Sequence, residues 1–188
     1  APHWPAPYGL GANPALQLLI DAELDAAGVH RPDLVIAGWA IPTILEHGTD
    51  AQRERFVAPT LAGEMIWCQL FSEPEAGSDL ASLRTKAVRG TGLDGEPGWL
   101  LTGQKIWTSA AHNAQWAVCL ARTDPEKPKH KGITYFVVDM ASAGIDIRPL
   151  RELTGRALFN EVFLDGVFVP DEMGVGEVDN GWRLARTT

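Results

Sequence analysis

The sequence predicts an α+β protein with a partial N-terminal helical domain, an antiparallel β-barrel or sandwich, and the start of a C-terminal helix. Three observations predict this class: a helical spacing of apolar residues before about residue 64, short strand-like segments after it, and an acidic, glycine-containing linker over residues 170–179. We therefore expect domains over residues 1–65 (partial helical), 66–178 (middle β-barrel) and 179–188 (the beginning of a truncated C-terminal helical domain).

Two helix signals open the chain. Asn13 and Pro14 predict a helix start, because the first is a capping side chain and the second has the φ angle of a first helical residue. Apolar side chains then recur on one face of a helix that ends at Gly28, and we expect this face to be buried: Leu16, Leu19, Ile20, Leu24 and Ala27.

The next two helices differ in pattern. Residues 34–45 are apolar nearly all round, which indicates a helix buried between others, with a kink or a new turn at Pro42. The third helix begins with a capping box at residues 49–52 and stops at Gly63. Its expected buried stripe consists of Phe56, Val57, Thr60 and Leu61.

After residue 64 the apolar spacing is that of strands. The predicted strands cover residues 65–71, 99–102, 115–122, 133–139 and 159–169. Several are apolar on both faces, so we expect them to be covered on two sides. Asp94-Gly95 and Asp165-Gly166 are turn signals between them, and residues 180–182 are expected to cap another helix.

Composition excludes several classes of protein. Of 188 residues, 45% are hydrophobic and 21% are charged, which is typical of a packed globular protein. The net charge of -8 argues against nucleic-acid binding, which needs clustered Lys and Arg. No segment approaches the roughly 20 apolar residues of a membrane span.

The cysteines and histidines indicate neither disulfides nor a metal site. Cys68 and Cys119 lie in apolar runs, and we interpret them as buried small hydrophobic side chains. The five histidines are scattered without partners at ligand spacing, so we expect no metal. Free thiols are typical of a reducing cytoplasm, where we place the protein.

Residues 69–79, which we call the first segment, carry one candidate for chemistry. A strand ends in a loop of small residues that lets a ligand approach the main chain. The hydroxyls of Ser72 and Ser78 and free backbone N–H groups suit an anion or a polar ring edge. The alternative is an ordinary tight turn, in which Asp79 caps the residues after it.

Residues 103–110, the second segment, carry the other candidate. Trp107 offers a flat apolar face to a planar cofactor, and Thr108 and Ser109 offer donors beside it. The alternative is a core tryptophan in a strand.

Other patterns support no site. Residues 9–11 lack the strand and the third glycine of a Rossmann fingerprint. Glu73 and Glu75 point to opposite sides of an extended chain, so they form no evident acid/base pair. Arg151, Glu152 and Arg156 indicate a solvated charge cluster, with phosphate binding as the alternative. We find no Ser-His-Asp arrangement.

The two segments together resemble the acyl-CoA dehydrogenase family of flavoproteins. Residues 71–79 resemble its (T/S)EPxAGSD signature, and residues 103–109 resemble its GQKxWxT/S segment. Residues 154–170 are similar to the family's end-of-barrel sequence, and residues 180–182 to the start of its C-terminal helical domain. Residues 4–62 are consistent with the latter part of its N-terminal helical domain.

The resemblance implies α,β-dehydrogenation of an acyl-CoA thioester to the trans-2-enoyl-CoA. In this family a carboxylate base takes the α-proton, and the β-hydrogen leaves as hydride to N5 of FAD. The electrons then pass to an electron-transferring flavoprotein, and the full-length protein is expected to be a homo-oligomer, a dimer or tetramer.

By the same resemblance, the first segment contacts both cofactor and substrate. Gln69, Phe71 and Ser72 match positions that line the flavin, with main-chain and hydroxyl contacts to its pyrimidine edge. Gly77 and Ser78 match the loop between the flavin and the CoA pantetheine, and Ser78 is the expected substrate contact.

The second segment is implied to form the other side of the flavin site. Trp107, Thr108 and Ser109 match positions that line the flavin there, and Ser109 is expected to bond near N5. Glu75 replaces the Gly of many members, which makes the loop bulkier and more acidic.

The family's catalytic carboxylate lies in the C-terminal helical domain, of which only residues 180–188 are expected here. We therefore assign no catalytic residue, and expect an inactive fragment that binds FAD poorly on its own. Two alternatives remain for the function. One is a non-catalytic partner subunit of the same fold, and the other is a flavin oxidase that uses oxygen.

Overall fold

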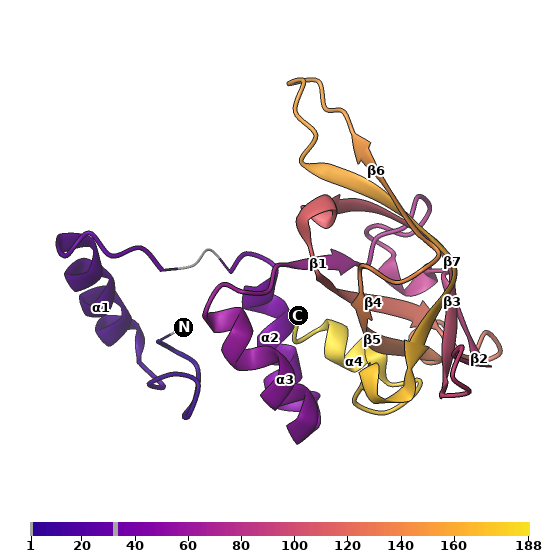
Figure 1. Ribbon diagram of the computed structural model, residues 1–188, viewed down its shortest axis with the longest axis horizontal. Coiled ribbons are helices and arrows are strands. Elements are labelled where there is room, and N and C mark those ends of the chain that lie inside the picture. Colours follow the sequence, from indigo (N-terminus) through magenta and orange to yellow (C-terminus); the bar gives the residue numbers. More distant parts are fainter. Residues whose placement is uncertain (1, 32–33) are drawn as a thin grey trace.

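The computed structural model describes residues 2–31 and 34–188, and it has the α+β class that the sequence predicts (Figure 1). Three helices come first, strands of one sheet come next, and a short helix ends the chain. The α-helices are α1 (Pro14–Ala26), α2 (Ala37–His47), α3 (Asp50–Leu61) and α4 (Gly181–Ala185). In the described part of the chain, short 3-10 helices cover Leu80–Ser82, Ala111–Asn113 and Asp171–Met173.

Helix α1 starts as predicted but does not bury its apolar face. The Asn13 side chain accepts a hydrogen bond from Leu16 N at 2.9 Å, and Pro14 is the first helical residue. None of the residues of α1 is buried, and the Leu19 side chain is 57% exposed. The expectation of a buried face is therefore wrong for this chain, because α1 lies apart from α2 and α3 (Figure 1).

Helices α2 and α3 pack against the sheet as buried elements. Helix α2 begins at Ala37, later than the expected residue 34, and runs through Pro42 to His47, with Ile41 and Ile44 completely buried. The capping box of α3 is present: Gln52 N donates to Thr49 Oγ1 and Thr49 N donates to Gln52 Oε1. Of the expected stripe, Phe56, Val57 and Thr60 are buried and Leu61 is half-buried.

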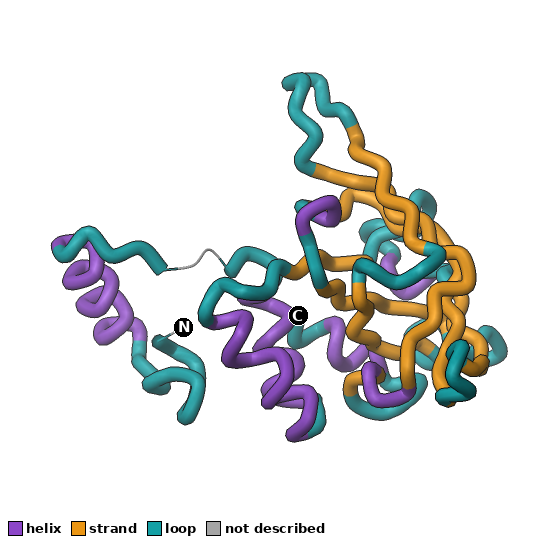
Figure 2. Tube along the Cα trace, viewed as in Figure 1, coloured by secondary structure: helices purple, strands orange, loops and turns teal. Residues whose placement is uncertain are grey.

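Within the described ranges, eight strands form one sheet in the order β6-β7-β3-β2-β4-β5-β8, with β1 paired to β4 (Figure 2). Most pairs are antiparallel, whereas β4 pairs in parallel with β1 and, at one position, with β2. The strands are β1 (Trp67–Leu70), β2 (Lys86–Thr91), β3 (Pro97–Ser109), β4 (Trp116–Arg122), β5 (Ile133–Asp139), β6 (Ile145–Leu150), β7 (Phe159–Pro170) and β8 (Gly174–Val175).

Strands β4 and β5 are buried on both faces, as their sequences predict. The sequence does not predict β2 or β6, because their residues are largely exposed and do not alternate cleanly. Strand β3 is much longer than the predicted residues 99–102, and it contains the whole GQKIWTS stretch. The expected linker over residues 170–179 contains β8, which pairs with β5.

Of the two expected turns, one is a turn and the other, at Asp165-Gly166, is a β-bulge within a strand. Asp94-Gly95 does lie in the β2–β3 hairpin, where Gly95 has a φ of +80°. Asp165 and Gly166, however, lie inside β7, where the register with β3 shifts. Gly166 has a φ of +62°, and this left-handed conformation accommodates an extra residue within the strand.

Helix α4 begins directly after Asn180, although the Asn180 side chain makes no capping hydrogen bond. The helix packs against β5, and a Cβ atom on Gly181 would lie 2.6 Å from Tyr135 N. Only glycine allows this close approach. Cys68 and Cys119 are free and buried, as expected. Among the described residues, no helix has the length and hydrophobicity that crossing a membrane requires.

Candidate functional site

The first and second segments meet at one end of the sheet. The first segment continues β1, and the second segment is the far half of β3. Ile106 N donates a hydrogen bond to Ser72 O at 2.9 Å, which joins the two segments directly. Residues separated by more than thirty positions in sequence are thus neighbours in space.

The loop of the first segment is closed by its own backbone. Glu73 N donates to Ala76 O at 3.1 Å, and Ala76 N donates to Glu73 O at 3.0 Å. Ala76 is buried beneath the loop, whereas Gly77 and Ser78 are exposed. A Cβ atom on Gly77 would meet nothing within 4 Å, so its outer side is open to a ligand.

The loop ends at Asp79, which is held by polar neighbours. Ser82 Oγ donates to Asp79 Oδ2 at 2.5 Å, and the Lys129 ammonium lies 2.7 Å from Asp79 Oδ1. The hydrogen bonds from Lys129 and Ser82 lower the pKa of this exposed carboxyl. The expected tight turn is present and leaves Gly77 and Ser78 accessible, but the Asp79 side chain makes no capping hydrogen bond to the 3-10 helix that follows.

A β-bulge places Trp107 on the surface. The register of β3 with β7 shifts between Lys105 and Thr108, so β3 carries one extra residue there. Trp107 has a φ of +60°, and its side chain is 60% exposed. A left-handed conformation costs a bulky residue on the order of 1–3 kcal/mol. The alternative of a core tryptophan is therefore wrong, because the bulge turns this ring outward.

The rest of the bulge is fixed from β7. Phe159 packs edge-on against Trp107, with ring centroids 6.0 Å apart. Asn160 Nδ2 donates to Thr108 O at 3.0 Å, and both side chains are buried. Among the described residues, Thr108 Oγ1 and Asn160 Oδ1 have no hydrogen-bond partner. Sequence reasoning missed Asn160, because nothing in its local pattern separates it from other strand residues.

The expected site residues differ in how far their side chains are exposed. Phe71 packs edge-on against Tyr135 and is buried, as is Thr108, so these two can reach a surface ligand only through the main chain. Gln69 is half-buried on β1. The remaining members are half-buried or exposed at the junction: Ser72, Gly77, Ser78, Trp107 and Ser109.

A buried ion pair lies between the two segments. Lys105 Nζ is 2.8 Å from Glu73 Oε1, and the side chains are 0% and 7% exposed. Burial opposes the charge on Glu73, but the Lys105 ammonium and hydrogen bonds from Lys105, Thr85 and Arg84 hold its pKa below its ordinary value. Glu75 is exposed and pairs with Arg84 at 2.9 Å, so the two glutamates do point apart.

A mostly apolar cavity of about 300 Å³ opens beside the second segment. It lies between the helical part and β1, where it could take an apolar group next to the Ser109 hydroxyl. Its lining residues are Leu34, Val35, Ile36, Ala37, Thr60, Gly63, Met65, Ile66, Trp67, Ser109 and Ala110.

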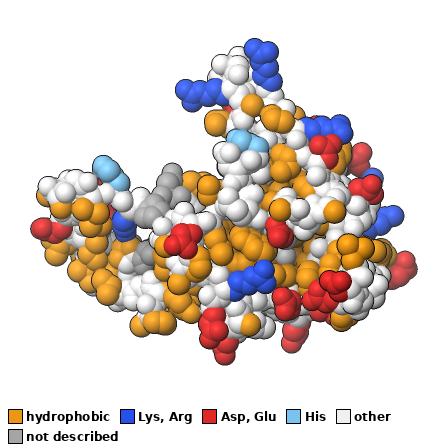
Figure 3. Space-filling model, viewed as in Figure 1, with side chains coloured by type: hydrophobic (Ala, Val, Ile, Leu, Met, Phe, Trp, Pro, Cys, Tyr) orange, Lys and Arg blue, Asp and Glu red, His pale blue; other side chains and the backbone are white. Residues whose placement is uncertain are grey.

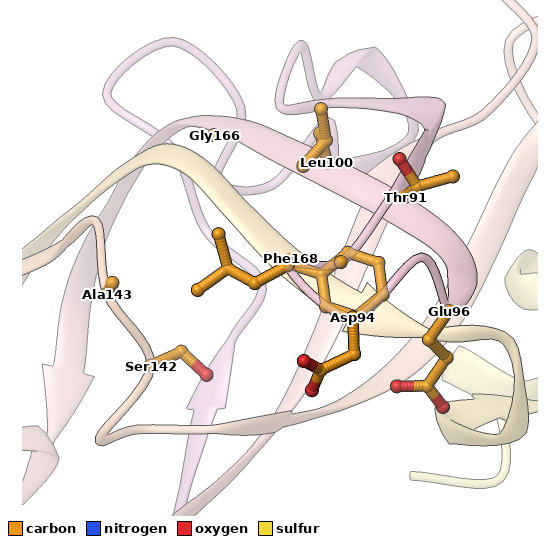
Figure 4. A pocket seen from close by; sticks show the side chains of 10 residues that line it. Thr91, Asp94, Glu96, Leu100, Ser142, Ala143, Gly166 and Phe168 are labelled. Carbon is orange, nitrogen blue, oxygen red and sulfur yellow. The ribbon is translucent and has the colours of Figure 1, made fainter.

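A larger cavity of about 490 Å³ lies elsewhere, between the β2–β3 hairpin and β7 (Figure 4). Asp94 and Glu96 line it beside the Phe168 ring, and it includes no residue of the two segments. Figure 3 shows Lys and Arg side chains on the protruding β6–β7 hairpin. Arg151 and Arg156 of this hairpin are exposed, which fits a solvated cluster.

Comparison with protein families decides the identity of the fold. A family model described as the middle domain of acyl-CoA dehydrogenase matches residues 68–167, more than half of the chain. The chain belongs to the acyl-CoA dehydrogenase family. The matched range contains all of the first segment and all of the second, so the junction described above lies within the acyl-CoA dehydrogenase middle domain.

Several acyl-CoA dehydrogenases are similar in sequence. Acyl-CoA dehydrogenase FadE34 of Mycobacterium tuberculosis is 76% identical over 188 residues, which is 100% of this chain and 26% of that protein. Acyl-CoA dehydrogenase IpdE1 of Mycolicibacterium smegmatis is 42% identical over 152 residues, 78% of this chain and 39% of that protein. The chain thus spans well under half the length of these relatives.

Several solved structures share the fold. The Tcur3481-Tcur3483 steroid ACAD superposes with a TM-score of 0.83 at 35% identity, over 97% of this chain and 46% of that one. The ChsE4-ChsE5 complex from Mycobacterium tuberculosis gives a TM-score of 0.82 at 35% identity, over 99% of this chain and 47% of that one. The described chain corresponds to the N-terminal and middle part of such proteins.

Proposed function

We propose that this chain is the N-terminal and middle part of an FAD-dependent acyl-CoA dehydrogenase, which converts an acyl-CoA thioester to the trans-2-enoyl-CoA. The hydrogen bond from Ile106 N to Ser72 O carries the proposal, because it joins the two segments that the family uses around its flavin. The proposed domains remain residues 1–65, 66–178 and 179–188, and the two free buried thiols support a cytoplasmic location.

The junction suits a flat redox cofactor. Trp107 presents an exposed aromatic face, and the half-buried Ser72 and Ser109 carry hydroxyl groups on the same two segments. Phe71 and Thr108 contribute through the main chain, since their side chains face inward. FAD, when bound, would accept a hydride from the substrate's β-carbon.

The open side of the loop suits the thioester substrate. Gly77 lets the pantetheine arm lie against the main chain, and the exposed Ser78 hydroxyl would bond to it. The acyl group would enter the cavity beside Ser109. The similarity to a protein described as a steroid ACAD supports an acyl group that carries rings.

The proposed chemistry needs a base from outside the described chain. Glu73 is the buried carboxylate closest in sequence to the proposed site residues, but its lowered pKa makes it a poor proton acceptor. Its oxygens are already occupied by four hydrogen bonds: from Arg84 N, Thr85 N, Thr85 Oγ1 and Lys105 Nζ.

Partners are implied by the same proposal. The electrons would pass to an electron-transferring flavoprotein, and the protein would assemble as a dimer or tetramer. A second candidate is a non-catalytic partner subunit, which is favoured by two structural neighbours whose names join two proteins, Tcur3481-Tcur3483 and ChsE4-ChsE5. An oxidase that passes electrons to oxygen is the third.

A visible spectrum tests the proposal. The longest polypeptide that carries this chain is purified, and its flavin bands are recorded before and after anaerobic addition of acyl-CoA, with linear and steroid side-chain thioesters compared. We expect flavin absorbance that bleaches with substrate. Flavin without bleaching favours the partner subunit, oxygen consumption favours the oxidase, and no flavin contradicts the proposal.

The isolated chain of 188 residues gives a further expectation. It should bind FAD poorly and show no dehydrogenase activity, because the family's other contacts to FAD lie in the C-terminal domain. A yellow, stoichiometrically loaded preparation of these residues alone would contradict this.

A further inference from the structure

The buried pair of Glu73 and Lys105 needs an explanation beyond stability. Taking two charges out of water is costly, and a buried ion pair often contributes no more than well-packed apolar side chains would. This pair is almost fully buried, with 2.8 Å between Lys105 Nζ and Glu73 Oε1. It lies between the two segments of the candidate site.

The Lys105 ammonium has three N–H donors, and all three have acceptors. It donates to Phe71 O at 3.1 Å, to Glu73 Oε1 at 2.8 Å and to Leu120 O at 2.8 Å. These acceptors belong to the residue after β1, to the loop of the first segment and to β4. One side chain of the second segment therefore bonds both to the first segment and to β4.

Glu73 extends the same network. Its Oε1 accepts from Thr85 N at 2.9 Å and from Thr85 Oγ1 at 2.6 Å, and its Oε2 accepts from Arg84 N at 2.6 Å. A Cβ atom on Gly103 would lie 2.7 Å from Thr85 Cα, so the second segment also packs closely there. The network is fully bonded, and removal of either charge would leave the other buried alone.

Glu73 and Lys105 are each close in sequence to a residue of the candidate site, Ser72 and Trp107 respectively. Glu73 directly follows Ser72, whose carbonyl accepts from Ile106 N. Lys105 is the last residue in regular register with β7 before the bulge that exposes Trp107. The pair thus joins the segments through buried side chains, and the backbone hydrogen bond joins them between the half-buried Ser72 and Ile106.

We propose that Glu73 and Lys105 are positioning residues, which set the spacing between Ser72 and Trp107 and thereby the width of the cofactor site. This inference rests on the proposed function. The pair itself touches no reacting atom. It acts through the main chain of the first segment and through the start of the bulge.

The decisive variant removes both charges together. Glu73→Gln/Lys105→Met avoids an unpaired buried charge, so we expect its free energy of unfolding to stay near that of the parent. The glutamine keeps an acceptor for Thr85, while the bonds from Lys105 to Phe71 O and Leu120 O are lost. The matched control is Glu75→Gln/Arg84→Met, which removes an exposed ion pair from the same loop.

Two readouts are measured on the longest polypeptide that carries this chain. The first is the hydrogen-exchange rate of the Ile106 amide, which donates to Ser72 O. The second is a titration with FAD, which gives the affinity for FAD and the visible spectrum of the bound flavin. In the double variant we expect faster exchange at Ile106, FAD binding weaker by about 10-fold or more, and altered flavin bands, because small misplacements are costly. The control should match the parent.

Each outcome is informative. Parent-like FAD affinity and spectrum in the double variant would overturn the proposal, as would unchanged Ile106 exchange. A double variant that does not fold would assign the pair to folding and overturn it too. If the parent binds no FAD while the double variant exchanges Ile106 faster, the proposed function fails but the spacing role of the pair stands.

Discussion

The two halves of strand β3 each carry a tryptophan, and the two side chains differ in exposure: Trp99 is buried and Trp107 is exposed. In the first half, Trp99 is 6% exposed and packs against Phe136, with ring centroids 5.9 Å apart. This half pairs regularly with β2 on one side and β7 on the other. In the second half, Trp107 lies in a bulge and is 60% exposed. Where β3 pairs in regular register, the tryptophan ring is buried, and where β3 carries one extra residue, the tryptophan ring is exposed.

The largest expected difference between the halves is in folding stability. Trp99→Ala should lower the free energy of unfolding by about 3–5 kcal/mol, because it removes a large buried side chain. Trp107→Ala should change it by about 0.5 kcal/mol or less, as is usual for an exposed site. Urea unfolding followed by circular dichroism measures both, and equal losses would contradict the comparison.

Cofactor retention should show the reverse order. We expect Trp107→Ala to weaken FAD retention by up to about 10-fold, since an aromatic contact contributes on the order of 0.5–1.5 kcal/mol beyond its buried area. Trp99→Ala should retain FAD wherever it is folded. Flavin content is compared after dialysis at a temperature where both variants are folded. Equal flavin loss would count against placing Trp107 at the flavin.

The comparison also shows what the sequence can and cannot predict. The strand-like pattern at residues 99–102 ends at Gly103, Gln104 and Lys105, because a charged residue in a strand normally indicates solvent. Lys105 is buried only because Glu73 neutralises it from another segment. No local pattern reports a partner 32 residues away.

The sequence does not predict the bulge at Trp107 either. Left-handed residues are usually glycine or asparagine, and the sequence has tryptophan at the position with a φ of +60°. Helix α1 gives the same lesson, because its spacing predicts an apolar face without showing what covers it. By contrast, the capping box at Thr49 and the buried strand β5 depend on neighbouring residues, and the sequence predicts both.

A smaller effect tests the backbone of the two halves. At position 107, Gly should be more stable than Ala by about 1 kcal/mol, because glycine adopts a positive φ without the cost that other residues incur. At position 99, in regular strand, Gly should be less stable than Ala by about 0.5–1 kcal/mol. Unfolding free energies of Trp107→Gly, Trp107→Ala, Trp99→Gly and Trp99→Ala give the two differences. The same sign at both positions would refute the role assigned to the bulge.

The last prediction concerns the buried ion pair of Lys105, in the second half of β3, with Glu73. We expect the variant without this pair to differ little in stability from the parent near neutral pH and to differ more in acid. A carboxyl whose pKa is lowered on folding contributes stability above its unfolded pKa, about 4.3 for Glu, and this contribution is lost as pH falls through the folded value. Glu73 has such a lowered pKa, so part of the acid destabilisation should come from it. In the Glu73→Gln/Lys105→Met variant, the free energy of unfolding should fall less steeply below about pH 4 than in the parent.

The matched exposed pair sharpens this expectation. Glu75→Gln/Arg84→Met should keep the parent's acid slope, because an exposed ion pair contributes little to stability. Urea unfolding at a series of pH values from neutral to acid gives the slopes. A parent-like slope in the Glu73→Gln/Lys105→Met variant would mean that Glu73 does not hold its charge through the buried pair. The second half of β3 would then differ from the first by its bulge alone.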